Sequence, residues 1–437
     1  MPSPARRIAL ILTEFPPHFG GMQTHAIHLA AHLQAAGHDI EVFTYRSDDL
    51  HAAAADFDTR CGYVVQRVLS RIGFWHNQHL LLRRLRAFQP DVIYASNVYY
   101  GLLGPALGVP VICRSVGNDV LRPWIVYPFR LGSGFCAWPS LESLLYRSFR
   151  RCNSPEWIEA LFRRTRLKLM QRTACANTHI LANSDYTIHA LQTIGVAASH
   201  LSTLPGGVDC RRFQPIACDR VALRQRYGLP ADARVLFTAC RFVAKKGIDF
   251  LLQQLPVLLK RHANTVLLIA GDGPERNRCE QLAAELGITG QVRFVGRVEH
   301  GEIEHCYWLS DLFVLASRIT RNPVSGLIDA ETMGRVLCEA NAAGVPVLAS
   351  NSGGIPSVIR HEDNGLLFAE DNAADFLLQF ERLTADDALR AQLVARGLAR
   401  AAREFDWVHL LAAHDAAFAV ACDVSARAST ALQPAIS

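Results

Sequence analysis

Short apolar segments alternate with segments of helical periodicity along most of this sequence, and this alternation restricts the possible fold more than any other feature. Apolar segments that follow turn-forming residues are typical of strands buried on both faces. Strands separated by helices pair in parallel, with helices covering both faces of the sheet. We therefore predict an α/β fold with doubly wound parallel sheets. The predicted strands are Arg7–Thr13, Asp39–Tyr45, Asp91–Ala95, Val109–Cys113, His179–Ala182, Val235–Ala239, Thr265–Ala270, Val292–Val295, Asp311–Ala316, Val345–Ala349 and Gly365–Phe368.

The length of the chain indicates two domains. Single hydrophobic cores stop growing near about 250–300 residues, and this chain has 437. We place one Rossmann-like domain at residues 1–207 and a second at 208–402, followed by helices at 403–437 that cross back to the first domain. Open α/β domains bind ligands at the carboxyl ends of their strands. We therefore expect the active site in a cleft across which the two domains face each other.

The charge of the chain is small overall but concentrated in one segment. The formal net charge of +5 is too small to indicate nucleic-acid binding, and no nucleic-acid motif is recognised. Leu141–Arg172 contains eight basic and three acidic residues, and 8 − 3 = +5 equals the whole excess. Apolar residues lie between the basic ones at near-helical spacing. This pattern suits either a helix on an anionic membrane surface or an ordinary helix with one buried side.

The cysteines and the N-terminus bear on the compartment. None of the 12 cysteines forms a Cys-x-x-Cys pair or a cluster with zinc-ligand spacing. We interpret them as small core residues in a reducing compartment. The apolar stretch Ile8–Leu12 is too short for a signal peptide, and no apolar run reaches the roughly 18 residues of a membrane span. We expect a cytoplasmic protein, able to associate peripherally with the inner face of the cell membrane.

Two glutamates, Glu331 and Glu339, form the sharpest chemical feature. Eight residues on a helix rise about 12 Å, so these carboxylates cannot act on one atom as a glycosidase-type acid and base. Gly334 lies between them and can open the helix, whose free N–H groups suit a pyrophosphate. The two carboxylates then suit hydroxyl groups at the two ends of one long ligand. The alternative is a pair of solvated helix glutamates.

Cations and glycines follow two of the predicted strands. Arg241 and Lys246 come after Val235–Ala239, where they can stabilise the charge of a leaving diphosphate. The alternative is a pair of surface cations before a helix. Gly20 and Gly21 follow the first strand and open a helix, which allows close approach to a ligand. They do not form a G-x-G-x-x-G fingerprint, and a simple glycine turn is the alternative.

These features belong to an ordered set of six motifs. The motifs are Gly20-Gly-Met-Gln-Thr-His25, Pro205-Gly-Gly-Val-Asp-Cys-Arg-Arg-Phe213, Arg241…Lys246-Gly247, Gly271–Pro274, Glu331…Glu339 and Gly353-Gly-Ile-Pro356. Each motif alone is common, but the set in this order resembles the family 4 retaining glycosyltransferases over nearly the whole chain. The resemblance implies the GT-B architecture, with the acceptor bound mainly by the first domain and a nucleotide-sugar by the second.

The resemblance also implies roles for individual residues. Arg241 and Lys246 would hold the donor phosphates, Glu339 the ribose diol and Glu331 the transferred sugar. Gly20 and Gly21 would line the phosphates from the other domain, and Gly334 would lie at the phosphate-binding helix start. No metal and no other cofactor would be required. The sequence agrees in lacking an Asp-x-Asp motif with flanking acidic residues.

Three departures from the family pattern bear on the sugar. The loop that often reads His-Gly-x-Asp is Val116-Gly-Asn-Asp119, so the histidine is absent and Asp119 is the remaining catalytic candidate. The Pro-Asn-Gly turn is Pro205-Gly-Gly. Thr332 replaces the usual glycine after Glu331, and Met333 and Arg335 are unusual neighbours. These changes affect the part of the site that would select the donor sugar.

The predicted activity is transfer of a hexose-type sugar from a UDP- or GDP-sugar to an acceptor hydroxyl with retention of configuration. The expected acceptor is a carbohydrate or a lipid-linked carbohydrate in cell-surface polysaccharide, lipopolysaccharide or glycolipid synthesis. Alternatives are a soluble small-molecule acceptor, another enzyme of the same architecture such as an epimerase or a phosphorylase, and a non-catalytic nucleotide-sugar sensor.

Overall fold

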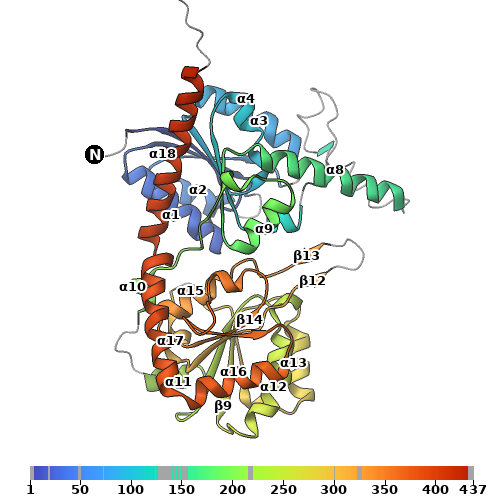
Figure 1. Ribbon diagram of the computed structural model, residues 1–437, viewed down its shortest axis with the longest axis vertical. Helices are drawn as coiled ribbons and strands as arrows, with labels where there is room; N and C mark the ends of the chain where they lie inside the picture. The colour runs from blue at the N-terminus through green and yellow to red at the C-terminus, as the bar shows by residue number, and fades with distance from the viewer. Residues whose placement is uncertain are drawn as a thin grey trace, which may run out of the picture. The chain divides into compact units, whose positions relative to one another are not determined.

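The computed structural model describes residues 4–17, 20–47, 51–71, 73–123, 125, 140–141, 144, 148, 156–214, 220–299, 301–321 and 327–431. The chain divides into two compact units (Figure 1). The first comprises Met1–Leu204 and Leu411–Ser437, and the second comprises Pro205–Leu410. The unit boundaries therefore lie at residues 204/205 and 410/411, where the sequence predicted 207/208 and 402/403.

The first unit contains a seven-stranded parallel sheet in the order β3-β2-β1-β4-β5-β6-β7. The order changes direction between β1 and β4, which is where open α/β sheets form ligand-binding crevices. The strands are β1 (Arg7–Ile11), β2 (Asp39–Tyr45), β3 (Val64–Leu69), β4 (Val92–Ala95), β5 (Val111–Ser115), β6 (His179–Ala182) and β7 (Leu201–Thr203).

Helices cover both faces of this sheet. They are α1 (Gly21–Ala35), α2 (His51–Arg60), α3 (Phe74–Phe88), α4 (Leu103–Leu107), α5 (Asn118–Leu121), α8 (Glu156–Cys175) and α9 (Asp185–Thr193), with 3-10 turns η2 (Val98–Tyr100) and η3 (Ala198–His200). One core joins α3 to β1 and β2 through Leu81, Ile11 and Phe43. A second core joins α8 and α9 to β5 and β6 through Met170, Leu191 and Cys113.

The C-terminal helix α18 (Trp407–Ala431) belongs to the first unit from Leu411 onward. Asp415 on this helix lies 2.8 Å from the Nε2 atom of His32 on α1. His414, which is fully buried, lies 3.3 Å from the hydroxyl of Tyr94 on β4. These polar contacts and the ring of Phe418 against Tyr94 attach α18 to the β1–β4 part of the sheet.

The second unit contains a six-stranded parallel sheet in the order β10-β9-β8-β11-β14-β15. Its change of direction lies between β8 and β11. The strands are β8 (Arg234–Ala239), β9 (Thr265–Ala270), β10 (Val292–Gly296), β11 (Leu312–Leu315), β14 (Val347–Asn351) and β15 (Leu366–Ala369). A separate antiparallel pair, β12 (Thr320–Arg321) and β13 (Ile328–Asp329), precedes Glu331.

The helices of the second unit are α10 (Cys210–Phe213), α11 (Arg220–Arg226), α12 (Ile248–Leu259), α13 (Arg276–Glu285), α14 (Ile303–Leu309), α15 (Arg335–Ala342), α16 (Ala373–Ala385) and α17 (Asp387–Arg400). Shorter turns are η4 (Ala244–Lys246), η5 (Thr289–Gln291), η6 (Ile355–Ser357) and the π-helical η7 (Ala401–Phe405). Alternate residues of β8 enter different cores: Phe237 packs with α14 and α15, whereas Leu236 packs with α12, α13 and α16. Burial on both faces explains why the strands appear in the sequence as continuous apolar runs.

The prediction of two doubly wound parallel α/β domains is confirmed, and each of the predicted strands is present. The sequence did not predict β3, β7, β12 and β13. The cleft between the domains stays a prediction.

Candidate active site

Lys246 and Glu331 meet at the carboxyl edge of the second sheet. Lys246 ends η4, the turn that follows β8, and its ammonium group donates a hydrogen bond to the Glu331 carboxylate. Each side chain is 13% exposed. Burial acts to lower the pKa of Lys246, but the charge of Glu331 holds it above its usual value. Burial likewise acts to raise the pKa of Glu331, but Lys246 holds it below its usual value. Both groups are therefore charged at neutral pH.

The backbone before α15 holds Glu331 in a turn. Its carbonyl oxygen accepts a hydrogen bond of 2.7 Å from the Gly354 N–H. A Cβ atom on Gly353 would lie 2.2 Å from that oxygen, and Gly353 has a φ of +54°. A side chain at position 353 would therefore displace Glu331. The Gly353-Gly-Ile-Pro356 motif thus explains how two segments pack closely behind the site.

Gly334 separates the two glutamates, as the sequence predicted that it could. It caps α15 with a φ of +86° and a ψ of 66°, and the helix begins at Arg335. Glu331 consequently lies in the turn before the helix, whereas Glu339 lies on the helix itself. The Leu337 N–H donates to the Gly334 carbonyl at 2.9 Å, and the positive end of the helix dipole makes this end of α15 suitable for an anion.

Glu339 is held inside the unit by two donors. Its Oε2 atom accepts a hydrogen bond of 2.9 Å from the hydroxyl of Tyr307, and its Oε1 atom lies 3.2 Å from the Nε atom of Arg335. The residue is 7% exposed. Burial and the charge of Glu339 raise the pKa of Tyr307 well above its usual value, so the hydroxyl keeps its proton. These donors orient the carboxylate, and Tyr307 and Arg335 were not identified as its partners from the sequence.

Two further cations lie on the segment after β8. Arg241 is exposed, and among the described residues no hydrogen bond or ion pair of its guanidinium is found. Lys245 instead lies 2.8 Å from the Oδ1 atom of Asp329, and its Nζ donates to the carbonyl of Ala330 at 3.0 Å. Lys245 is not among the residues predicted from the sequence, although it adjoins Lys246. The structure brings Lys246, Glu331 and Gly334 together, with Glu339 one helix turn beyond the start of α15.

The remaining candidates belong to the first unit. Gly20 is the extended N-cap of α1, and Gly21 is the first residue of that helix. Asp119 is 4% exposed, and its carboxylate accepts hydrogen bonds from the Ser115 hydroxyl at 2.8 Å and the Val98 N–H at 3.1 Å. Burial raises its pKa, although these hydrogen bonds act in the opposite direction. The contacts favour a role for Asp119 in holding the turn after β5, and a contact with the sugar stays a prediction.

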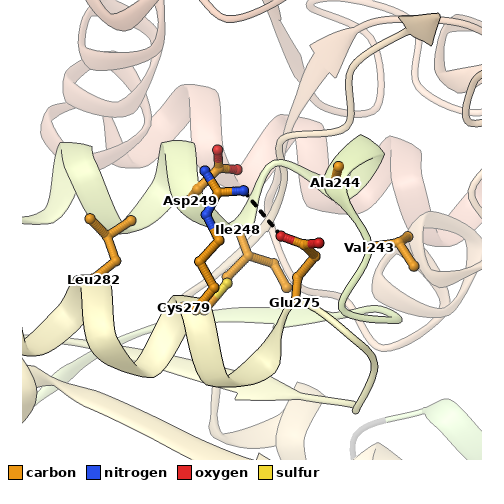
Figure 2. Close-up of a pocket in the computed structure, with 8 residues that line it drawn as sticks. Val243, Ala244, Ile248, Asp249, Glu275, Cys279 and Leu282 are labelled. Carbon is orange, nitrogen blue, oxygen red and sulfur yellow. Dashed lines mark hydrogen bonds and ion pairs between the residues drawn. The ribbon is translucent and has the colours of Figure 1, made fainter. Parts of the chain in front are cut away.

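A pocket lies beside η4 (Figure 2). Its apolar wall includes Ile248 and Leu282, and Glu275 and Arg278 form an ion pair of 3.2 Å at its rim. The described residues that line it include none of the predicted donor-binding residues. We therefore place the candidate site at Lys246, Glu331 and α15 rather than in this pocket.

Two family profiles match the chain. The profile "Glycosyltransferase Family 4" matches residues 19–212, and "Glycosyl transferases group 1" matches residues 219–400. The two matches correspond to the two doubly wound domains and include the motifs that form the candidate site. The chain belongs to the family 4 glycosyltransferases, and the resemblance found in the sequence is confirmed.

Curated relatives match part of the chain. The GDP-mannose-dependent alpha-(1-6)-phosphatidylinositol monomannoside mannosyltransferase of Mycobacterium tuberculosis is 36% identical over 209 residues, covering 46% of this chain and 53% of that protein. The lipopolysaccharide core biosynthesis glycosyltransferase LpsE of Rhizobium meliloti is 32% identical over 182 residues, covering 42% and 47%. The chain thus spans about half the length of the curated relatives it matches.

A solved structure resembles the chain over nearly its full length. The crystal structure of Anabaena Alr3699/HepE in complex with UDP has a TM-score of 0.70 at 19% identity, covering 95% of this chain and 100% of that one. This likeness confirms the predicted fold class.

Proposed function

We propose that this protein transfers a hexose from a nucleoside diphosphate sugar to an acceptor hydroxyl with retention of configuration. The observation that carries the proposal is the meeting of Lys246 with Glu331 in front of the α15 start. This arrangement combines a cation for phosphates, the positive end of a helix dipole and a carboxylate for hydroxyl groups. Glu339 and Tyr307 supply a second carboxylate position on the same helix. These groups match, in order, the sugar hydroxyls, the diphosphate and the ribose diol of a nucleotide-sugar.

The proposed reaction separates the sugar from its diphosphate on one face. The bond between the anomeric carbon and the diphosphate oxygen breaks, and the acceptor oxygen bonds to that carbon on the same face. The proton of the acceptor hydroxyl passes to the departing diphosphate oxygen. Lys246, Arg241 and the α15 N-terminus would stabilise the negative charge on the leaving group, while Glu331 would orient the sugar hydroxyls. The step needs no metal and no covalent enzyme intermediate.

GDP-mannose is the first donor to test. The mycobacterial relative, at 36% identity, is named for dependence on GDP-mannose and for a phosphatidylinositol mannoside acceptor. The rhizobial relative is named for lipopolysaccharide core synthesis. Both names support a lipid-linked carbohydrate acceptor for this chain, in synthesis of a glycolipid or of a cell-surface polysaccharide.

A lipid-linked acceptor would require the protein to work at a membrane surface. The predicted basic segment Leu141–Arg172 lies partly outside the described residues, but α8 is described from Glu156 onward. Trp157 is 67% exposed and Leu161 is 46% exposed on this helix. Arg164 and Lys168 are exposed beside them. We propose that α8 faces anionic lipid on the cytoplasmic side of the membrane. No described helix is long and apolar enough to cross a bilayer.

The decisive experiment offers the purified chain a panel of donor sugars. Release of GDP from GDP-mannose or UDP from UDP-glucose is measured with and without lipid-linked and soluble glycan acceptors, each with and without a chelator. Transfer with a retained α-linkage, seen by NMR of the product, supports the proposal. Transfer to soluble acceptors alone would show that the acceptor is soluble rather than lipid-linked. Epimerised donor without transfer would indicate a different enzyme class, and an inverted linkage would contradict the mechanism.

A further inference from the structure

A segment of the second unit leaves the main sheet after β11 and returns immediately before Glu331. The described residues of this excursion form the short pair β12 and β13, in which Thr320 lies opposite Asp329 (Figure 1). Two residues after Asp329 the chain reaches Glu331. The position of Glu331 therefore depends on how the ends of the excursion are fixed.

Lys245 holds both ends. Its carbonyl oxygen accepts a hydrogen bond of 2.8 Å from the N–H of Arg318, on the outgoing side. Its ammonium group lies 2.8 Å from the Asp329 carboxylate and donates to the Ala330 carbonyl at 3.0 Å, on the returning side. The side chains of Lys245 and Asp329 are 15% and 18% exposed. Little water screens this ion pair, so it contributes more than an exposed pair does.

The adjacent lysines Lys245 and Lys246 contact residues that are themselves adjacent in the sequence. Lys245 reaches Asp329 and the Ala330 carbonyl, and Lys246 reaches Glu331. From the other side, the Gly354 N–H holds the carbonyl of Glu331. The consecutive carbonyls of residues 330 and 331 are thus fixed by separate donors, and the carboxylate of Glu331 is left to face Lys246.

We propose that Lys245 is a positioning residue for the sugar-contacting end of the donor site, acting through Asp329 and the Ala330 carbonyl without touching the donor. The proposal rests on the proposed function, because it takes Glu331 as the group that meets the transferred sugar. Catalytic groups must be held within about 0.5 Å of their productive geometry by surrounding contacts. Loss of the Lys245 contacts would let the backbone of Ala330 and Glu331 move, while the phosphate-binding side of the site stayed intact.

The test uses full-length protein and the variants Lys245→Met, Lys245→Arg, Asp329→Asn and the double variant Lys245→Met/Asp329→Asn. Lys260→Met, an exposed lysine at the end of α12, is the matched control. GDP and UDP binding is measured by calorimetry, and steady-state turnover of GDP-mannose and UDP-glucose is measured beside it. Thermal melting of each variant monitors folding.

We expect Lys245→Met and Asp329→Asn to lower kcat/KM for the donor sugar about tenfold or more, since a small misplacement of a reacting group is costly. Affinity for the nucleoside diphosphate should stay within about twofold of wild type. The double variant should be no worse than the single ones, because both remove one interaction. Lys245→Arg should recover most of the activity, since it restores the cation.

Three outcomes would overturn the proposal. Lost nucleoside diphosphate affinity in Lys245→Met but not in Asp329→Asn would show that Lys245 binds phosphate directly. Activity equal to that of Lys260→Met would show that the contacts do not matter. A lower melting temperature accompanied by equal losses of nucleotide binding and donor-sugar turnover would show that the ion pair only stabilises the fold. A wild-type chain that binds neither GDP nor UDP would instead refute the proposed function itself.

Discussion

The hydroxyl of Tyr307 donates a 2.9 Å hydrogen bond to Glu339 inside the second unit, where neither side chain has free access to water. Tyr307 also packs edge-on against Phe237 of β8, with ring centroids 5.0 Å apart. The central strand of the sheet therefore fixes the tyrosine, and the tyrosine fixes the carboxylate on α15. The orientation of Glu339 is determined by the core before any ligand binds.

Tyr307→Phe should show whether nucleotide binding depends on the hydrogen bond that orients the Glu339 carboxylate, because the burial of the ring is kept. The substitution keeps the ring packing but leaves one oxygen of a buried carboxylate without its donor, which costs about 1–3 kcal/mol. We expect a lower free energy of unfolding in urea and weaker binding of GDP or UDP. Tyr227→Phe, a half-buried tyrosine elsewhere in the unit, is the control. Unchanged nucleotide affinity in Tyr307→Phe would argue against Glu339 as a ribose ligand.

Substitution of Glu339 and of Glu331 should impair different steps of the reaction. Glu339→Gln should weaken binding of the free nucleoside diphosphate, because its carboxylate is assigned to the ribose diol. Glu331→Gln should leave that binding near normal and reduce turnover of the complete donor sugar. Calorimetry with GDP and UDP, combined with steady-state kinetics, distinguishes the two effects. Equal loss of nucleotide affinity in both variants is incompatible with the assignment.

Lys246→Met should reduce turnover about 10²–10³-fold, the range found when one charge-stabilising donor is removed from an active site. This substitution also leaves the Glu331 carboxylate buried without its cation, so stability should fall as well. The double variant Lys246→Met/Glu331→Gln separates the effects, because it removes both charges. It should regain stability yet remain inactive. Recovery of activity together with stability would show that Lys246 has only a structural role.

The same pair predicts how stability depends on pH. The pKa of Glu331 is lowered in the folded chain, so its contribution is present above the unfolded value of 4.5 and is lost as pH falls through the folded value. The pKa of Lys246 is raised, so its contribution is present below the unfolded value of 10.5 and is lost as pH rises through the folded value.

The stability difference between wild type and Lys246→Met/Glu331→Gln should therefore be constant from about pH 5 to pH 10. Wild type should lose stability relative to the double variant in acid below pH 4.5, where Glu331 takes up its proton in the unfolded chain first and then in the folded one. Urea unfolding at successive pH values from neutral to acid measures this difference. A change in this stability difference already between pH 7 and pH 5 would assign the effect to a histidine rather than to the Lys246–Glu331 pair.

The strands could be predicted because most are buried on both faces and therefore appear as continuous apolar runs. β3 was missed because it is the edge of its sheet: Val64 is 58% exposed, and Gln66 and Arg67 interrupt the apolar pattern. β12 and β13 are two residues each and have no periodicity to detect. The local sequence pattern also does not reveal that Asp329 on β13 forms an ion pair with Lys245, 84 positions earlier in the chain.

The sequence motifs selected the candidate residues but not the residues that hold them in place. The order of motifs selected Lys246, Glu331, Gly334 and Glu339, since each is a recognisable residue type at a recognisable spacing. Tyr307 and Lys245 act across 32 and 84 positions of sequence, the intervals to Glu339 and Asp329, and no local signal links them. The unusual turn Pro205-Gly-Gly and the unusual Met333 also prove to be linked, because the Gly206 N–H lies 3.0 Å from the Met333 sulfur.

The exposed face of α8 makes a membrane prediction that can be tested residue by residue. With about 100° between successive residues, Trp157, Leu161, Arg164 and Lys168 fall on one face, and all four are exposed. The apolar pair lies at the N-terminal end of this face and the basic pair one to two turns later. Such a face suits the boundary between headgroups and acyl chains, where tryptophan is favoured and each basic residue adds about 1 kcal/mol on an anionic surface.

Flotation with liposomes should therefore recover wild-type protein on vesicles rich in anionic lipid and release it as salt rises, because exposed charges are screened within about 8 Å at physiological ionic strength. Trp157→Ser/Leu161→Ser should weaken binding at every salt concentration, since it removes apolar insertion. Arg164→Gln/Lys168→Gln should weaken binding mainly at low salt, since it removes the electrostatic part. Arg83→Gln/Arg84→Gln removes the same charge from the exposed side of α3 and should bind like wild type. If all three variants float equally well, α8 is not the lipid-binding surface. If wild-type protein ignores anionic vesicles even at low salt, the helix is structural and a soluble acceptor becomes the better candidate.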